Sequence, residues 1–181
     1  MTEEEQKPKR KSKLPVEVTE EELNGILEYT PSFHHRLAIA YSWLHGLRIS
    51  ESLKLQPKDF NVENKRLYIF GGKGDKDRVV PLKIQDFQEA HLKYFPIGCS
   101  KRALQKAFET AVKNCGLKEK KPTVHFNSLR HGFATHCLRK EVKLTNIQLA
   151  LGHNDLSTTS VYLRVTPDEM IDDITSKCSW T

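Results

Sequence analysis

The hydrophobic pattern of this chain changes its period twice, and this limits the folds open to it. From Phe33 to Leu47, apolar side chains cover most of a helix circumference, which predicts a central helix with neighbours on several sides. After Pro57 the pattern alternates with period two in three short segments between Phe60 and Leu82, and the glycines at 71–77 suit a turn. Helical periodicity then returns. The chain is therefore predicted to be α+β and mostly helical, with a small three-stranded antiparallel sheet on one side.

Helix boundaries follow from capping signals. Thr19 and Glu22 form a capping box, Asn127 or Ser128 is expected to cap the helix that follows it, and Thr145 the next one. Glycines at the ends of periodic segments predict where helices stop. The helices expected lie at 19–29, 33–47, 50–55, 84–95, 101–115, from 127 or 128 to 137, 145–152, a short one carrying Tyr162, and 167–177.

Composition predicts one folded domain, residues 14–181, preceded by a disordered tail, residues 1–13. The chain has 181 residues, of which 38% are hydrophobic and 29% charged. The tail has no apolar residue after Met1 and is expected to bind DNA phosphates through its basic half, or else to be simply solvated. Its basic residues are Lys7, Lys9, Arg10, Lys11 and Lys13.

A net charge of +6 favours a polyanionic partner such as nucleic acid. No segment approaches the roughly 18 apolar residues that span a bilayer, and the N-terminus does not resemble a signal peptide, so a soluble cytoplasmic protein is expected. Four cysteines are widely separated without a CxxC pair, which favours thiols over a disulfide or zinc site. We therefore expect no metal and no cofactor.

Four motifs combine residues suited to phosphate chemistry. They are GLRISE at 46–51, GGKGDKDR at 71–78, NSLRH at 127–131, and LGH at 151–153 with Tyr162 nine positions after the histidine. Each alone has a structural interpretation, such as a salt bridge within the first motif or an exposed turn lysine in the second. All four lie at the ends of elements, where side chains can face a common cleft, and this favours a functional interpretation of the set.

In order and spacing, these motifs resemble the catalytic domain of the tyrosine recombinases, also called the phage integrase family. The resemblance covers nearly the whole folded part. It implies that Arg48 and Arg130 hold the scissile phosphate, that Lys73 acts from a β-hairpin, that His153 assists, and that Tyr162 is the nucleophile. It further implies a site-specific recombinase or integrase acting through a 3′-phosphotyrosyl intermediate on double-stranded DNA.

That chemistry suits these residue types. Guanidinium groups are planar and always charged, so they can bind the non-bridging oxygens on which negative charge accumulates during attack by a phenol. A lysine near the leaving 5′ oxygen can supply its proton. Because the bond energy is kept in the phosphotyrosine, neither a metal nor ATP is required.

The chain departs from the family pattern at Asn127, where a histidine is usual. An amide cannot take a proton at neutral pH, so we expect Asn127 to contact the phosphate and a histidine or water to deprotonate Tyr162. Two further residues are expected to orient the arginines without contacting the substrate. They are Glu51, three residues after Arg48, and His131, next to the second arginine.

A second departure is length, since the family usually has a DNA-clamping domain before this one and residues 1–18 cannot form it. The tail would then be an interdomain linker. A homotetramer on paired DNA sites is expected, with a monomer or weak oligomer in the absence of DNA. Two alternatives remain open, namely a DNA-binding module of the same fold with impaired catalysis and a type IB topoisomerase-like enzyme. Whether the last helix docks on its own subunit or on a neighbour is also open.

Overall fold

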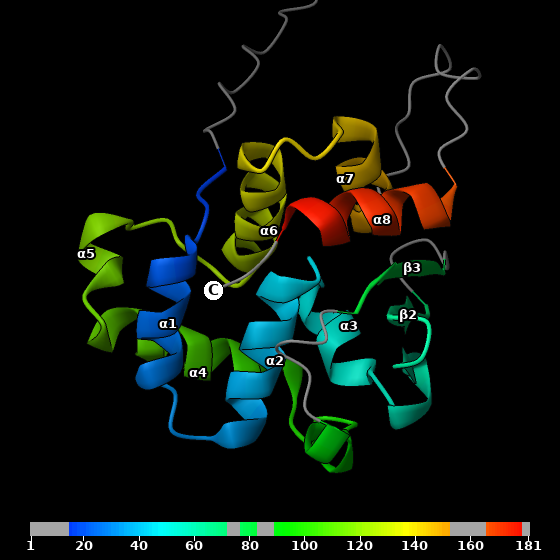
Figure 1. The fold of residues 1–181 in the computed structure, drawn as a ribbon. Coiled ribbons are helices and arrows are strands. Elements are labelled where there is room, and N and C mark those ends of the chain that lie inside the picture. The colour runs from blue at the N-terminus through cyan, green and yellow to red at the C-terminus, as the bar shows by residue number, and fades with distance from the viewer. Residues whose placement is uncertain (1–14, 72–76, 83–88, 153–165, 179–181) are drawn as a thin grey trace, which may run out of the picture.

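The computed structural model describes residues 15–71, 77–82, 89–152 and 166–178. Eight α-helices, three strands and two short 3-10 helices make up these parts of the chain (Figure 1). They are α1 Glu20–Glu28, α2 Phe33–Leu44, α3 Ile49–Lys54, η1 Pro57–Asp59, β1 Phe60–Asn61, β2 Arg66–Ile69, β3 Arg78–Pro81, η2 Glu89–Tyr94, α4 Lys101–Asn114, α5 Leu117–Lys120, α6 Asn127–Arg139, α7 Leu144–Leu151 and α8 Pro167–Lys177. The predicted fold class, mostly helical with one small sheet, is confirmed.

The sheet is antiparallel with the order β1-β2-β3 and lies at one side of the molecule, beside α3 and α8 (Figure 1). Leu67 sits opposite Phe60 on one side and Val80 on the other, and all three are buried. The period-two pattern therefore does place one face of the sheet against the core. Val62 is the exception, because it lies after the end of β1 and is exposed.

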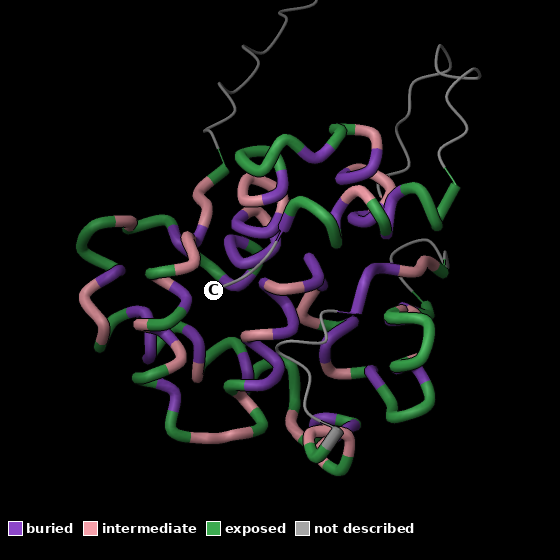
Figure 2. Tube along the Cα trace, in the orientation of Figure 1, coloured by how far each residue is buried: buried purple, intermediate pink, exposed green. Residues whose placement is uncertain are grey.

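Helix α2 is the central helix that its sequence predicted. Its buried residues face α1, α3, α4 and α6, and the buried stretches in Figure 2 run through α2, α4 and α6. The indole Nε1 of Trp43 donates a 2.7 Å hydrogen bond to the carbonyl of Val18, which ties the segment before α1 to the core. The helix ends at Leu44, and Gly46 follows with a φ of +63°. Gly46 therefore occupies the left-handed region that glycine adopts without steric cost.

Local capping signals near the N-terminus are correct. Thr19 Oγ1 accepts a hydrogen bond from the Glu22 amide, and the Glu22 carboxylate accepts one of 2.8 Å from the Thr19 amide. Neither residue proposed for α6 caps that helix. Asn127 is its first residue and bonds His131 instead, and the Ser128 hydroxyl accepts a hydrogen bond from the His125 amide.

The prediction that Thr145 caps the next helix is wrong. Helix α7 begins at Leu144, so Thr145 is its second residue, and Asp173 of α8 contacts the start of the helix. The Asp173 carboxylate accepts a 3.0 Å hydrogen bond from the Lys143 amide and a 2.6 Å hydrogen bond from Asn146 Nδ2. A residue far along the chain thus anchors the start of this helix.

The expected helix at 84–95 is also corrected. Its described part, η2, is a 3-10 helix. It stops at Tyr94, two residues before Pro96, and a proline disfavours the α conformation in the residue before it. Residues 83–88 lie outside the described parts.

Helix α8 packs within its own chain. A Thr166–Glu169 capping box starts it, and its buried residues Met170, Ile171 and Ile174 lie against α7 and β3. Cys137 and Cys178 are both buried, with their sulfur atoms 3.7 Å apart. No helix in the described ranges combines the length and apolar character needed to cross a bilayer.

Candidate functional site

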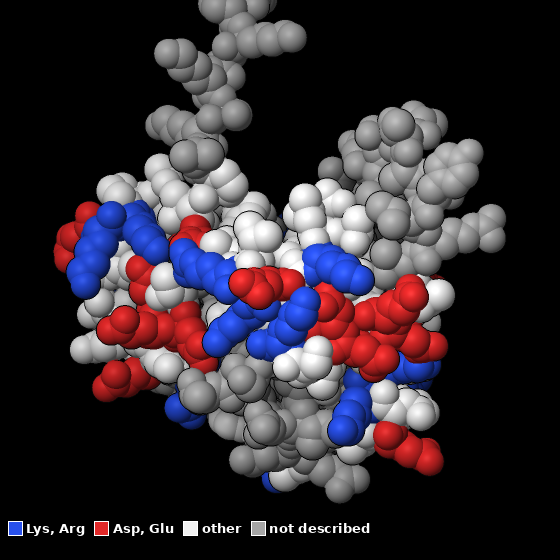
Figure 3. Space-filling view, turned by 45° about the horizontal axis from the view of Figure 1, so that its top comes forward, with Lys and Arg blue, Asp and Glu red and all other residues white. Residues whose placement is uncertain are grey.

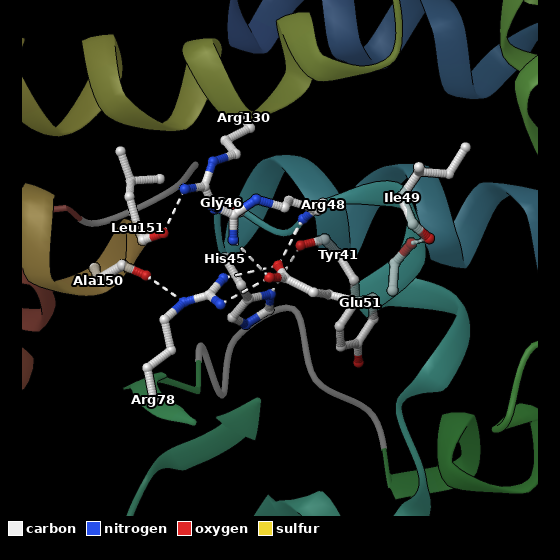
Figure 4. A network of polar contacts seen from close by, with 11 residues as sticks. Tyr41, His45, Gly46, Arg48, Ile49, Glu51, Arg78, Arg130, Ala150 and Leu151 are labelled. Atoms are coloured by element: carbon white, nitrogen blue, oxygen red, sulfur yellow. Dashed lines mark hydrogen bonds and ion pairs between the residues drawn. The ribbon is translucent and has the colours of Figure 1, made fainter. Parts of the chain in front are cut away.

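Glu51 lies at the centre of a cluster of charged side chains drawn from distant parts of the chain (Figure 4). Arg48 precedes α3 and Glu51 is the third residue of that helix, so the carboxylate folds back onto the arginine. Oε2 accepts a 2.8 Å hydrogen bond from the Arg48 amide, and Oε1 accepts one of 2.8 Å from Arg48 Nη1. The Glu51 side chain is only 2% exposed.

Arg78, the first residue of β3, completes the coordination of this carboxylate. Its Nη1 donates to Oε1 of Glu51 at 2.9 Å and its Nη2 to Oε2 at 2.8 Å, which is the parallel two-bond geometry that arginine favours with carboxylates. Its Nε donates a 2.8 Å hydrogen bond to the carbonyl of Ala150 in α7. The Arg78 side chain is 7% exposed and points into the protein.

Arg130 projects from α6 into the same cluster but binds carbonyl groups. Its Nη1 donates a 2.6 Å hydrogen bond to Gly46 O, and its Nη2 donates to Leu151 O. Carbonyl oxygens at the C-terminus of α7 therefore receive two arginines, and cations are favourable there because the helix dipole is negative at that end. Arg130 is 5% exposed.

Gly46 makes this approach possible. A Cβ added there would lie 2.7 Å from Phe133 Cδ1 and 2.8 Å from Leu151 Cδ2. Such distances are well inside normal contact, so any larger residue would push the turn away from α6 and α7. The glycine of the GLR motif is thus required both for its positive φ and for close packing beside Arg130.

The cluster is electrostatically unbalanced. Burial lowers the pKa of Arg130 to about 9, helped by the positive charges of Arg48 and Arg78 and opposed by the charge of Glu51. Burial alone would raise the pKa of Glu51, but hydrogen bonds and charge from Arg78, together with hydrogen bonds from Arg48, lower it to about 2. In this cluster three guanidinium groups face a single carboxylate. An anion bound at the arginines would relieve their mutual repulsion.

Comparison with known proteins identifies the family. The model of the phage integrase family matches residues 17–95 and 98–169. A tyrosine recombinase of Pseudothermotoga lettingae is 32% identical over 183 residues, covering 92% of this chain and 62% of the relative. This chain belongs to the phage integrase family. It spans about six-tenths of the length of the curated relatives it matches.

Solved structures of integrases share the fold. The integrase from mycobacterium phage Brujita aligns with a TM-score of 0.71 at 19% identity, covering 96% of this chain and 62% of that one. The XerH site-specific recombinase, solved bound to its difH substrate in a pre-cleavage complex, aligns with a TM-score of 0.64 at 32% identity. That alignment covers 87% of this chain and 52% of XerH.

The structure of this integrase-family chain brings together Arg48, Glu51 and Arg130, three of the residues that its motifs singled out (Figure 4). Asn127 and His131 lie on the exposed side of α6, with Asn127 Nδ2 3.0 Å from His131 Nε2. The other predicted residues, Lys73, His153, Tyr162 and the tail residues Lys7, Lys9, Arg10, Lys11 and Lys13, lie outside the described residues.

The ends of two undescribed segments lie beside the cluster. Gly71 donates its amide to Asp77 Oδ1 at 3.0 Å, which closes the base of the hairpin immediately before Arg78. Gly152 precedes the segment with the predicted nucleophile, and a Cβ there would lie 3.0 Å from Arg78 Cδ. The first of these segments therefore ends two residues before Arg78, and the second begins after Gly152, which lies beside Arg78.

Arg78 is the member of the site that sequence reasoning missed, although a signal was present. In a strand, Arg78, Val80 and Leu82 share one face, and the two apolar residues predict that this face is buried. An arginine at such a position needs a buried acceptor. Basic and acidic side chains are mixed on the face shown in Figure 3, so the net charge of the chain does not point to this site. The period-two pattern around Arg78 is the better guide.

Proposed function

We propose that this chain is the catalytic part of a site-specific DNA recombinase that cuts and rejoins strands through a 3′-phosphotyrosyl intermediate. The observation that carries the proposal is the convergence of Arg48 and Arg130 on one buried cluster with an excess of positive charge. Two guanidinium groups can bind both non-bridging oxygens of a phosphodiester and stabilise the charge of a five-coordinate phosphorus. Membership in the phage integrase family supports the same chemistry.

In the proposed reaction the phenol oxygen of Tyr162 attacks the phosphorus and the bond to the 5′ oxygen breaks. Lys73 donates a proton to that oxygen, and the phenol proton passes to a histidine or to water. A free 5′-hydroxyl from another strand reverses these steps and rejoins the DNA. Bond making and breaking balance without an external energy source.

The histidine position of the family is the point at which this chain differs. Asn127 cannot accept the phenol proton, but its amide contacts the imidazole of His131 one helical turn further along α6. We propose that Asn127 binds the phosphate and that His131 supports it, while His153 contributes a second imidazole. Double-stranded DNA is the proposed partner, with four subunits acting on two paired sites.

A nicked suicide substrate tests the proposal. Cleavage near a nick releases a short oligonucleotide, so the covalent protein–DNA adduct accumulates and is detected by denaturing electrophoresis. We expect an adduct with the unmodified chain, none with Tyr162→Phe, and a normal adduct with Tyr29→Phe, in which an exposed tyrosine at the end of α1 is changed.

The adduct assay, together with assays of DNA binding and of relaxation of supercoiled DNA, separates the alternatives. DNA binding with no adduct would indicate a binding module of the same fold. Relaxation of supercoiled DNA without exchange of strands would indicate a topoisomerase-like enzyme. An adduct that survives Tyr162→Phe would refute the assignment of the nucleophile.

A further inference from the structure

Arg78 connects three segments that carry different parts of the proposed site. It starts β3 at the base of the hairpin, grips Glu51 of α3 with two hydrogen bonds, and holds the Ala150 carbonyl near the end of α7 with a third. Figure 4 shows it between the Glu51 carboxylate and the α7 carbonyl. Arg78 therefore links the β-hairpin to the end of α7 and, through Glu51, to Arg48.

We propose that Arg78 is a positioning residue that holds the two phosphate-binding arginines in place and ties the β-hairpin to them. The inference rests on the proposed strand-transfer function. One path runs from Arg78 through Glu51 to Arg48, because the carboxylate that receives both Arg78 nitrogens also receives Arg48 Nη1 and the Arg48 amide.

The second path runs through α7 to Arg130. Arg78 Nε binds the carbonyl of Ala150, and Arg130 Nη2 binds the carbonyl of the next residue, Leu151. Both carbonyls belong to the last turn of α7, Leu144–Leu151, where the regular helical conformation fixes the position of each relative to the other. A shift of Arg78 therefore displaces the acceptor of Arg130 as well.

Arg78 acts through these partners and not on the phosphate. Its three nitrogens already donate hydrogen bonds inside the protein, and its side chain is 7% exposed against 27% for Arg48. A lysine at this position keeps the positive charge but has no planar fork, so it cannot bond both carboxylate oxygens and the α7 carbonyl together. The substitution Arg78→Lys thus separates geometry from charge.

We expect Arg78→Lys to reduce the rate of adduct formation at saturating DNA by about 100-fold, which is the effect of misplacing catalytic groups by about 1 Å. The equilibrium affinity for DNA and its dependence on salt should change far less than the rate, because Arg78 itself makes no contact with the phosphate. The matched control is Arg66→Lys on the neighbouring strand, whose partner Asp168 is mostly exposed, and this variant should keep the normal rate.

A second readout does not depend on catalysis. The side-chain Nε–H signals of Arg48 and Arg130 in nitrogen-15 NMR spectra report the geometry of the cluster in the free protein. Arg78→Lys should shift or broaden both signals, and Arg66→Lys should leave them unchanged. If the unmodified chain forms no adduct, the proposed function fails while this measurement still decides the role of Arg78.

The proposal is overturned if Arg78→Lys keeps the normal rate with unchanged arginine signals. A loss of DNA affinity as large as the loss of rate would also overturn it, since Arg78 would then bind phosphate directly. Should Arg78→Lys not fold, the double variant Arg78→Met with Glu51→Gln leaves no unpaired buried carboxylate or Arg78 charge and is expected to fold. That variant should show the same loss of rate, and a normal rate in it would refute the proposal.

Discussion

Replacing Glu51 with glutamine is the most direct test of how the arginine cluster is held. The side chain keeps its shape but loses its charge, and one of its two acceptors becomes a donor that faces an arginine N–H. Four hydrogen bonds from Arg48 and Arg78 end on this carboxylate, and it is 2% exposed. The substitution therefore leaves the positive charge of Arg78 buried without its partner.

The pKa of Glu51 gives the magnitude. Despite burial, which alone would raise it, the bonds from Arg78 and Arg48 lower this pKa from 4.5 to about 2. A difference of this size corresponds to about 3 kcal/mol of stability at neutral pH, and breaking buried ion pairs costs about 3–5 kcal/mol. For a chain of this size, that predicts a fall of about 10 °C in the melting temperature.

The sign of the pH dependence follows from the lowered pKa. The carboxylate stabilises the fold fully above pH 4.5, the ordinary pKa of a glutamate side chain, and this contribution is lost as the pH falls from about 4.5 to about 2. The free energy of unfolding of the glutamine variant should therefore approach that of the unmodified chain over this interval.

Urea unfolding followed by circular dichroism, at neutral pH and at a series of acid values, measures both effects. The matched control is Asp168→Asn, which breaks the ion pair with Arg66 at a side chain that is 67% exposed and should cost less than about 1 kcal/mol. Equal losses in the two variants would refute the reasoning. So would a difference between Glu51→Gln and the unmodified chain that does not shrink below pH 4.5.

Three further predictions concern the packing and chemistry around the site. Gly132→Ala should destabilise the fold by about 3 kcal/mol, because the new Cβ would lie 2.1 Å from a backbone carbonyl oxygen, whereas Gly98→Ala, with nothing within 4 Å, should be neutral by thermal unfolding. Asp173→Ala removes two hydrogen bonds at the start of α7 and should cost about 1 kcal/mol, with faster hydrogen exchange there, whereas exposed Asp172→Ala should have neither effect. Asn127→His adds an imidazole that titrates near neutral pH, so it should change the rate or pH profile of adduct formation. An unchanged rate and pH profile would refute the proposal that another group acts as the base in place of the histidine that the family usually has at position 127.

Features governed by neighbouring residues could be predicted from sequence. The Thr19–Glu22 capping box needs only one helical turn, and Gly46 and Gly152 end their helices with positive φ as expected. The strands also followed from alternation, because one face of a sheet must be buried wherever it forms. The motifs placed Arg48 and Arg130 in the same proposed site through resemblance to a family.

Only the tertiary structure decided which distant groups satisfy one another. Asp173 holds the start of a helix that begins some thirty positions earlier, and the local capping signal at Thr145 gave no indication of this contact. Arg78 has a recognisable buried position in its strand, but nothing local names Glu51 as its partner. A polar group at a helix end can find its hydrogen-bond partner within a few residues of the chain, so the pairing is visible in the sequence. A buried charge is satisfied by whichever partner the packing of distant segments brings to it. For that reason the members of the cluster could be nominated from sequence, but the contacts that hold it together could not.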